Sequence, residues 1–102
     1  MAKFLVVYKG GQMAGTPEEQ EATMNEWMAW FGSMGSAVTD FGNPFSGGAA
    51  IATDGSHGAA TTDLTGYSII EADHLDAAAA MLAACPNFTS GGSVEVFEAI
   101  PM

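Results

Sequence analysis

The pattern of apolar and polar positions divides the chain into strands and helices. Residues 3–8, 66–72 and 93–100 are rich in β-branched and aromatic side chains, and each run predicts a strand. In the first of these runs both alternating faces are apolar, which is typical of a central strand covered on both sides. Residues 37–41 predict a further strand, and residues 49–53 predict a short strand that ends at an Asp-Gly turn.

A first helix is predicted to begin after Thr16 and to run to about residue 31. Thr16 is a good N-cap, Pro17 suits the first helical position, and Glu19 at the third position can complete a capping box. Four large apolar residues repeat at helical spacing and predict the buried face: Met24, Trp27, Met28 and Phe31. Trp30 lies off this face, so it either belongs to a second buried surface, at a subunit contact or a pocket wall, or is half-exposed.

A second helix is predicted over residues 75–85. Asp73 is the expected N-cap, an alanine-rich run follows it, and Pro86 forbids continuation of the helix. With its flanking strands this helix makes a β-α-β unit. Residues 56–65 are small and polar, and we expect them to form the least ordered loop, either a plain surface loop or one that gates a ligand.

The predicted order of elements is close to the ferredoxin-like βαββαβ pattern with an extra short hairpin, so the fold class is α+β. In that fold two helices cover one face of a four-stranded antiparallel sheet. One side of the last strand carries Val94, Val96 and Ile100, and the other carries Phe97 and Ala99. Because both sides are apolar, we expect the sheet of a second subunit to pack on the face without helices and to form a homodimer.

Composition narrows the classes of partner and compartment. With 102 residues and 48% apolar composition the chain predicts one folded domain, residues 1–102, despite a net charge of −10. Lys3 and Lys9 are its only basic residues, which argues against nucleic acid or an anionic membrane as a partner. The single cysteine, Cys85, can form no disulfide within the chain. The chain enters its first strand without a charged leader or a long apolar stretch, so we expect a cytoplasmic protein.

His57 and Asp54 are the candidates for catalysis, as an acid/base pair. A histidine changes protonation near neutral pH, and Asp54, three residues earlier across a turn, can orient or charge the ring. The simpler alternative is an Asp-Gly turn beside an exposed histidine. His57 and His74 do not stand at metal-ligand spacing, and no glycine loop indicates a nucleotide site, so we expect no metal and no cofactor. Four aromatic residues could line a pocket for a small organic ligand or simply pack in the core: Tyr8, Trp27, Trp30 and Tyr67.

Several short motifs follow one another in a characteristic order. They are a first strand ending at Tyr8, Thr16-Pro17-Glu18-Glu19-Gln20, Thr53-Asp54-Gly55, Gly66-Tyr67, Glu71-Ala72-Asp73, Cys85-Pro86 and Gly92-Ser93-Val94-Glu95-Val96. In order and spacing the chain resembles the YCII-related, or DGPF-domain, proteins over nearly its whole length. The resemblance implies a ferredoxin-like fold of the dimeric α+β barrel type, in which two sheets enclose a cleft, and some members of the family are suspected enzymes. Ser56-His57 stands where the DGPF motif has Pro-Phe, and the first helix lacks the histidine of the YCII branch.

Three functions are compatible with these observations. The first is a small homodimeric protein that binds a small organic ligand in the cleft between its sheets, with acid/base chemistry of the lyase or isomerase type at His57 and Asp54. The alternative is a non-catalytic domain that senses a ligand or binds a protein. A third interpretation, an oxygenase that needs no cofactor, rests on analogy of fold alone.

Overall fold

The computed structural model describes residues 1–11 and 15–102, so the segment that joins the first strand to the first helix lies partly outside the described residues. In chain order the elements are β1 (Ala2–Lys9), α1 (Pro17–Met34), the 3-10 turn η1 (Gly35–Ala37), β2 (Val38–Asp40), β3 (Ala49–Ile51), β4 (His57–Ala59), β5 (Leu64–Ala72), α2 (Leu75–Met81), the 3-10 turn η2 (Pro86–Phe88) and β6 (Ser93–Ala99). Each predicted strand and helix is present, with changes at some of the ends.

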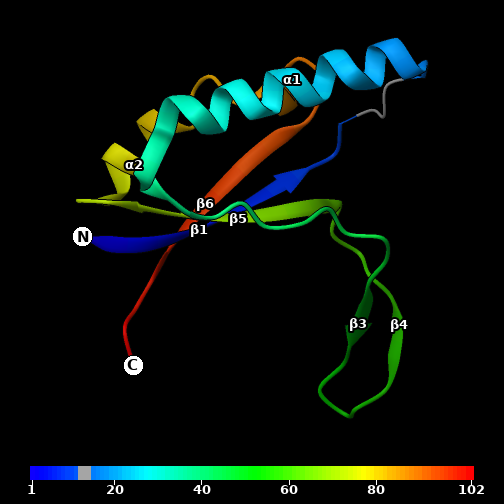
Figure 1. Cartoon of the computed structure of the whole chain (residues 1–102). Helices are drawn as coiled ribbons and strands as arrows, with labels where there is room; N and C mark the ends of the chain where they lie inside the picture. Colours follow the sequence, from blue (N-terminus) through cyan, green and yellow to red (C-terminus); the bar gives the residue numbers. More distant parts are fainter. Residues whose placement is uncertain (12–14) are drawn as a thin grey trace.

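The main sheet has four antiparallel strands in the order β2-β5-β1-β6. β1 is an inner strand, as its two apolar faces predict, and pairs with β5 on one side and β6 on the other. Both neighbours run antiparallel to β1 and are therefore parallel to each other, which is the arrangement that a crossover through α2 produces. Figure 1 shows both helices over the same face of this sheet. The strand order and the layering confirm the predicted α+β, ferredoxin-like fold.

β3 and β4 form a separate two-stranded hairpin, which corrects the expectation of a poorly ordered loop over residues 56–65. His57 pairs with Ile51 across the hairpin, and Gly55, with a φ of 88°, closes the turn. The sequence did not predict β4, because its residues are small and lack the β-branched and aromatic side chains typical of strands. Its pairing with β3 depends instead on the backbone of the tight turn. The hairpin projects from the main sheet on the side away from the helices (Figure 1).

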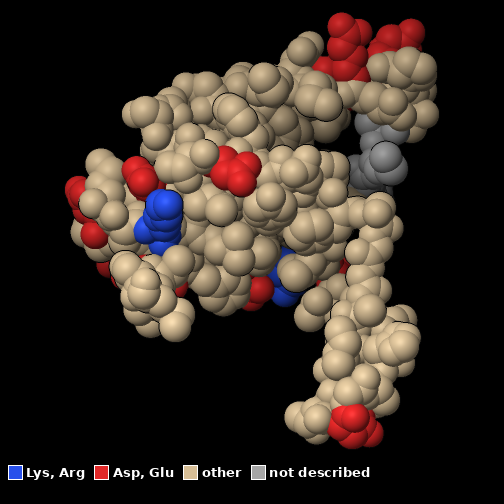
Figure 2. Space-filling view, turned by 60° about the horizontal axis from the view of Figure 1, so that its bottom comes forward, with Lys and Arg blue, Asp and Glu red and all other residues tan. Residues whose placement is uncertain are grey.

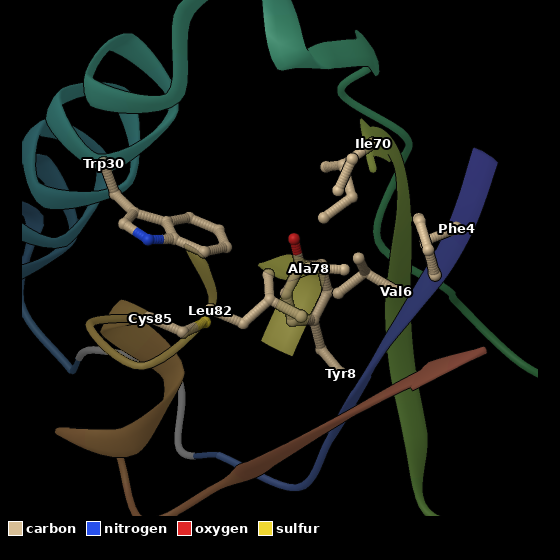
Figure 3. Packing of buried hydrophobic residues seen from close by; sticks show 9 residues of the cluster. Phe4, Val6, Tyr8, Trp30, Ile70, Ala78, Leu82 and Cys85 are labelled. Atoms are coloured by element: carbon tan, nitrogen blue, oxygen red, sulfur yellow. The ribbon is translucent and has the colours of Figure 1, made fainter. Parts of the chain in front are cut away.

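We call the face of the main sheet under the helices the covered face and the opposite face the open face. The buried core lies between the covered face and the helices (Figure 3). β1 contributes Phe4, Val6 and Tyr8 to it, because alternate residues of a strand point to the same face. The other buried apolar residues of the core are Trp30, Ile70, Ala72, Ala78, Leu82 and Cys85.

Both helices begin with a side chain that accepts a backbone N–H. In α1 the Glu19 N–H donates to the Thr16 hydroxyl at 3.1 Å, as predicted. In α2 the Ala77 N–H donates to His74 Nδ1 at 3.1 Å, so the N-cap is His74 and not Asp73. The imidazole nitrogen satisfies the third helical N–H in the way that a carboxylate oxygen would.

The buried face of α1 differs from the predicted one. Trp30 is buried, whereas Met24 and Met28 are exposed. The residues of α1 that pack on the core share the predicted helical spacing but lie one turn further along: Trp27, Trp30, Phe31 and Met34. Periodicity alone cannot separate two stripes with the same spacing, and the larger apolar area of the indole rings explains which one is buried.

Two predicted ends are also corrected. α2 stops at Met81, earlier than predicted, and the chain continues in tight turns up to Pro86. Pro86 bars a helix beyond residue 85, and before it the backbone tightens, because the N–H groups of Leu82, Ala83 and Cys85 each donate to the carbonyl three residues earlier. β6 ends at Ala99, and Ile100, expected on the same side as the strand valines, lies beyond the strand and is exposed.

Candidate functional site

Tyr8, Trp27, Trp30 and Phe31 form what we call the aromatic cluster, between α1 and the covered face. The ring centroids are 4.9 Å apart for Tyr8 and Trp27, 6.4 Å for Tyr8 and Trp30, and 5.7 Å for the two tryptophans. Phe31 contacts both tryptophans. The structure therefore brings together three of the residues that the sequence suggests for a pocket wall, and in a single chain their rings fill the space between helix and sheet.

A buried hydrogen-bond chain links the aromatic cluster to β5. The Tyr8 and Ser68 hydroxyls are 2.8 Å apart, and the Ser68 hydroxyl donates to the Phe41 carbonyl at 2.6 Å. Because Ser68 has a single hydroxyl proton, Tyr8 is the donor to Ser68. Burial raises the pKa of Tyr8 to about 12, outweighing the hydrogen bond with Ser68. Tyr8 is therefore protonated at neutral pH and cannot serve as a base.

Tyr67, the fourth residue suggested for the pocket, lies on the open face of the sheet. It is the register partner of Val7 and shares the open face with it. Its ring stacks on Phe45 with centroids 5.9 Å apart and an angle of 15° between the planes. The main sheet thus separates Tyr67 from the aromatic cluster, so a ligand that contacts Tyr67 approaches the open face.

The open face has an apolar centre. Its side chains there come from β1, β5 and β6 and include Leu5, Val7, Ile69 and Phe97. Leu5 is 38% exposed and Phe97 is 52% exposed, whereas Phe4, Val6 and Ile70 on the covered face are fully buried. Val7 is the buried member of the open-face group and is 8% exposed. Figure 2 shows this surface as an uncharged area between the two lysines. A bare apolar area in the middle of a sheet indicates a binding surface.

The charged residues on these three strands balance on the open face. The pairing register puts two lysines and two glutamates there: Lys3, Lys9, Glu71 and Glu95. The Lys9 ammonium lies 3.6 Å from a Glu95 carboxylate oxygen. Two positive and two negative charges sum to zero, whereas the whole chain carries a net charge of −10. The open side of β1, β5 and β6 is therefore neutral in a strongly acidic protein.

A polar hollow lies at the end of the main sheet where β1 finishes and β6 begins. Its volume is about 220 Å³, and its lining residues are Lys9, Gly10, Asp63, Gly91, Gly92 and Ser93. The Gly10 N–H donates to the Asp63 carbonyl at 2.9 Å, which ties the start of β5 to the end of β1. Because Lys9 belongs both to the hollow and to the open face, the hollow continues that face at one end.

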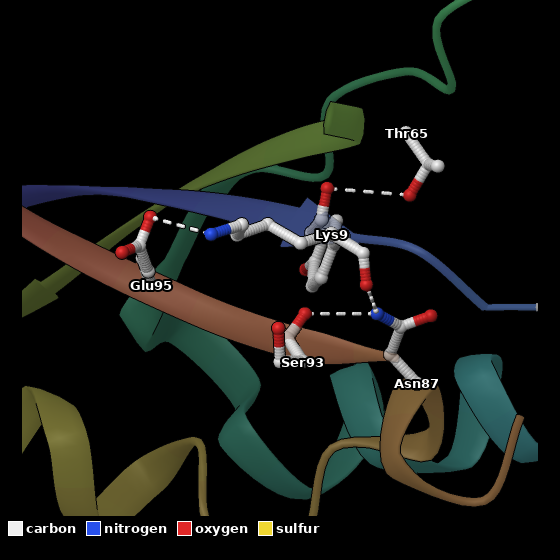
Figure 4. Close-up of polar contacts among 6 residues, drawn as sticks. Lys9, Thr65, Asn87, Ser93 and Glu95 are labelled. Atoms are coloured by element: carbon white, nitrogen blue, oxygen red, sulfur yellow. Dashed lines mark hydrogen bonds and ion pairs between the residues drawn. The ribbon is translucent and has the colours of Figure 1, made fainter. Parts of the chain in front are cut away.

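Asn87 links two of the segments that line the hollow. Its side-chain amide donates to the Lys9 carbonyl at 3.1 Å and to the Ser93 carbonyl at 2.9 Å (Figure 4). A side chain at Gly92 would collide with this amide, so the chain needs a glycine there. A buried amide with both protons used is a fixed structural support rather than a group available to a ligand.

His57 and Asp54 both lie on the β3–β4 hairpin and are exposed. The Asp54 carboxylate accepts the Ser56 N–H at 2.9 Å and the Ser56 hydroxyl at 2.6 Å. These two hydrogen bonds lower the pKa of Asp54. Among the described residues no hydrogen bond or ion pair joins Asp54 to His57.

Several residues of structural interest were not singled out from the sequence. Ser68 could have been noticed, because alternation in its strand puts it on the same side as Ile70 and so in the core. Lys9 stands out as one of two basic residues. The part played by Asn87 depends on contacts between distant segments and has no local signal.

Comparison with known proteins identifies the family. The strand order, with two helices on one face, defines a ferredoxin-like α+β domain. The chain belongs to the YCII-related domain family, whose model matches residues 2–102. No curated protein and no solved structure matches it.

Two features of residues 1–11 and 15–102 bear on partners. No helix in these ranges has the length and apolar composition needed to cross a membrane. Within them, His, Cys, Asp and Glu side chains do not gather in groups of three or more that could hold a metal ion.

Proposed function

We propose that the protein is a cytoplasmic homodimer whose open faces pack against one another and enclose a cleft for a small organic ligand. The observation that carries this proposal is the apolar centre of the open face, where Leu5 and Phe97 remain exposed on a sheet whose other face is covered by both helices. Antiparallel sheets with two apolar faces need a cover on both. A second copy of the same face supplies that cover with two-fold symmetry.

Charge supports a second copy as the cover. Two chains that each carry a net charge of −10 repel one another over most of their surfaces. The open side of β1, β5 and β6 avoids this repulsion, because its two lysines and two glutamates balance, and Asp40 on the edge strand β2 adds one negative charge. In a two-fold arrangement the lysines of one sheet can also face the glutamates of the other, which favours this orientation over others.

The ligand that suits this surface is small and mostly apolar, with one polar end. Leu5, Tyr67 and Phe97 offer apolar and aromatic contacts, and Lys9 offers a cation beside the polar hollow. The Lys9–Glu95 pair is partly exposed, and such pairs contribute less than about 1 kcal/mol, so a ligand carboxylate can replace Glu95 at little cost. Small aromatic carboxylic acids are therefore the first class to test.

His57 is the proposed acid/base group for lyase- or isomerase-like chemistry. Its ring is accessible, and an imidazole can both accept and donate a proton near neutral pH. Asp54 remains its candidate partner, although the hydrogen bonds from Ser56 favour a role in shaping the turn that carries His57.

A second candidate function is non-catalytic ligand sensing or protein binding. The hydrogen bonds of Asp54 to Ser56 favour it, because they occupy the carboxylate that would otherwise orient His57. The two candidates differ in the fate of a bound ligand. Catalysis predicts that His57→Ala removes turnover and keeps binding, whereas sensing predicts a bound ligand that is never converted.

The experiment is a titration of isotope-labelled protein with small aromatic carboxylic acids, monitored through amide chemical shifts. We expect shifts concentrated on β1, β5 and β6, and weaker binding in Lys9→Met. The neutral amides of the same acids are the matched control and should bind more weakly. Shifts confined to the surface of α1 would contradict the proposal, as would equal binding of acids and amides in Lys9→Met and in the unchanged protein.

A further inference from the structure

The β3–β4 hairpin is an exposed arm, which we define as residues 49–59. Every side chain from residue 51 to residue 59 is exposed. In the described part of the chain the arm's hydrogen bonds are internal: the strand pairing, Ala52 N–H to Ser56 O, Gly55 N–H to Ala52 O, and Asp54 with Ser56. An isolated two-stranded hairpin is at best marginally stable in water. An arm with three residues in each strand therefore needs contacts from outside its own chain.

The arm extends on the side of the open face. Figure 1 shows it leaving the end of the main sheet and pointing away from both helices. Its base is fixed to that sheet, because the Phe45 N–H donates to the Thr65 carbonyl at 2.9 Å. A second copy packed on the open face therefore lies beside the arm.

The reach of the arm matches the thickness of a two-sheet sandwich. Strands rise about 3.3 Å per residue, so the three paired residues of each strand span about 10 Å. Two sheets packed face to face are also about 10 Å apart. The Ile51–His57 pair stands at the far end of the strands, and so lies at or beyond the level of the second sheet.

The arm and its base are almost free of charge. Residues 41–62 contain one of the twelve acidic residues of the chain, Asp54, which lies at the tip. In Figure 2 the hairpin is correspondingly uncharged except at its end. A chain with a net charge of −10 can present this segment to a second copy without strong repulsion. Ile51, a large exposed apolar residue, can then be buried against the other subunit.

From these observations we propose that the arm packs on the second copy of the chain and carries His57 across to it, so that each acid/base site is built from two subunits. The proposal rests on the homodimer proposed above. It adds that the hairpin is an exchanged element, and that a single chain holds only part of the site.

Hydrogen exchange tests whether the arm is docked. Amides of Ala50, Ile51, Gly58 and Ala59 should exchange at least tenfold more slowly in the wild-type dimer than in the Phe97→Asp chain, which we expect to be monomeric. Amides of β1 serve as the control, because the core of that strand is intact in both. Equal arm exchange rates in a dimer and in a monomer would overturn the arm proposal and leave the dimer standing.

A measurement on the unchanged protein shows which chain the arm contacts. Dimers are prepared from isotope-labelled and unlabelled chains, and only contacts between the two chains are recorded by filtered nuclear Overhauser spectra. We expect cross-subunit contacts from the Ile51 methyl groups. A wild-type dimer with cross-subunit contacts from Phe97 but none from Ile51 overturns the arm proposal alone. A wild-type monomer overturns both this proposal and the proposed function.

Discussion

The two faces of the main sheet belong to the same strands, but only one of them is covered by the helices of the chain. On β1, Phe4 and Val6 point to the covered face and are fully buried, while Leu5, between them, is partly exposed on the open face. The covered face is complete within the chain, because two helices, the aromatic cluster and a hydrogen-bonded serine close it. The open face has a similar apolar centre and nothing from its own helices over it (Figure 1). One face is therefore completed by the folding of the chain itself, and under the proposed function the other is completed by a partner.

The largest expected effect on stability separates the two faces directly. Phe4→Ala should lower the free energy of unfolding by about 3–5 kcal/mol, because it removes a fully buried ring and leaves a cavity. The matched control is Phe97→Ala on the open face, which should change the stability of the single chain by about 0.5 kcal/mol or less. Urea denaturation of both variants, at a concentration low enough that the chain is monomeric, measures this. Equal losses would contradict this difference between the two faces.

Alkaline pH should weaken the covered face through Tyr8. Its pKa is raised from 10.0 to about 12 in the folded chain. The unfolded chain therefore releases this proton first, so the contribution of Tyr8 is complete below pH 10 and is lost as the pH rises towards about 12. Two pKa units correspond to about 3 kcal/mol. Denaturation of the wild-type protein and of Tyr8→Phe across this range gives the test, and parallel pH profiles for the two proteins would refute it.

Ser68 and Thr39 compare a buried with an exposed hydrogen bond, and the expected difference in stability is smaller than for the two phenylalanines. Ser68→Ala should cost about 1–3 kcal/mol, because the buried Tyr8 hydroxyl and Phe41 carbonyl each lose a partner. Thr39→Ala removes an exposed hydrogen bond to the Ile69 carbonyl and should cost about 0.5 kcal/mol or less. Thermal unfolding of the two variants measures the difference. The interpretation fails if Thr39→Ala is the more destabilising change.

The smallest effect is expected at the ion pair of the open face. Lys9→Met should lower stability by less than about 1 kcal/mol, since the pair is partly exposed and 3.6 Å long. The loss should shrink as salt is added, because salt screens exposed charges. Unfolding at low and high salt measures it. A large loss of unfolding free energy that does not depend on salt would contradict this prediction, because it would mean that Lys9 stabilises the fold through packing and not through the ion pair.

Much of the fold could be predicted from the sequence, because strand alternation and helix caps are local. The capping of α1 by Thr16 and the inner position of β1 follow from residues close in the chain. The buried side of α1 does not, since Trp27 belongs to both possible stripes and only packing against the sheet selects Trp30 over the methionines. β4 was missed for a related reason, because its pairing depends on the turn at Gly55.

The candidate site was harder to predict than the fold. Tyr8, Trp27 and Trp30 do lie together, but the sheet separates them from Tyr67, which no spacing along the chain could indicate. The engagement of Asp54 with Ser56 also depends on the geometry of one turn. The proposed site between two subunits could not be predicted from the sequence. It depends on which apolar surface the folded chain leaves exposed, and only the packing of the helices on the covered face determines that.

The molecular mass of the native protein in solution tests the central claim most directly. Sedimentation equilibrium of the wild-type chain should give twice the mass of one chain, and Phe97→Asp should shift it to a single chain while its circular dichroism remains that of the folded protein. The matched control is Met28→Asp on the exposed side of α1, which should remain a dimer. A wild-type protein that sediments as one chain at concentrations well above micromolar would contradict the claim that the open face is covered by a second copy.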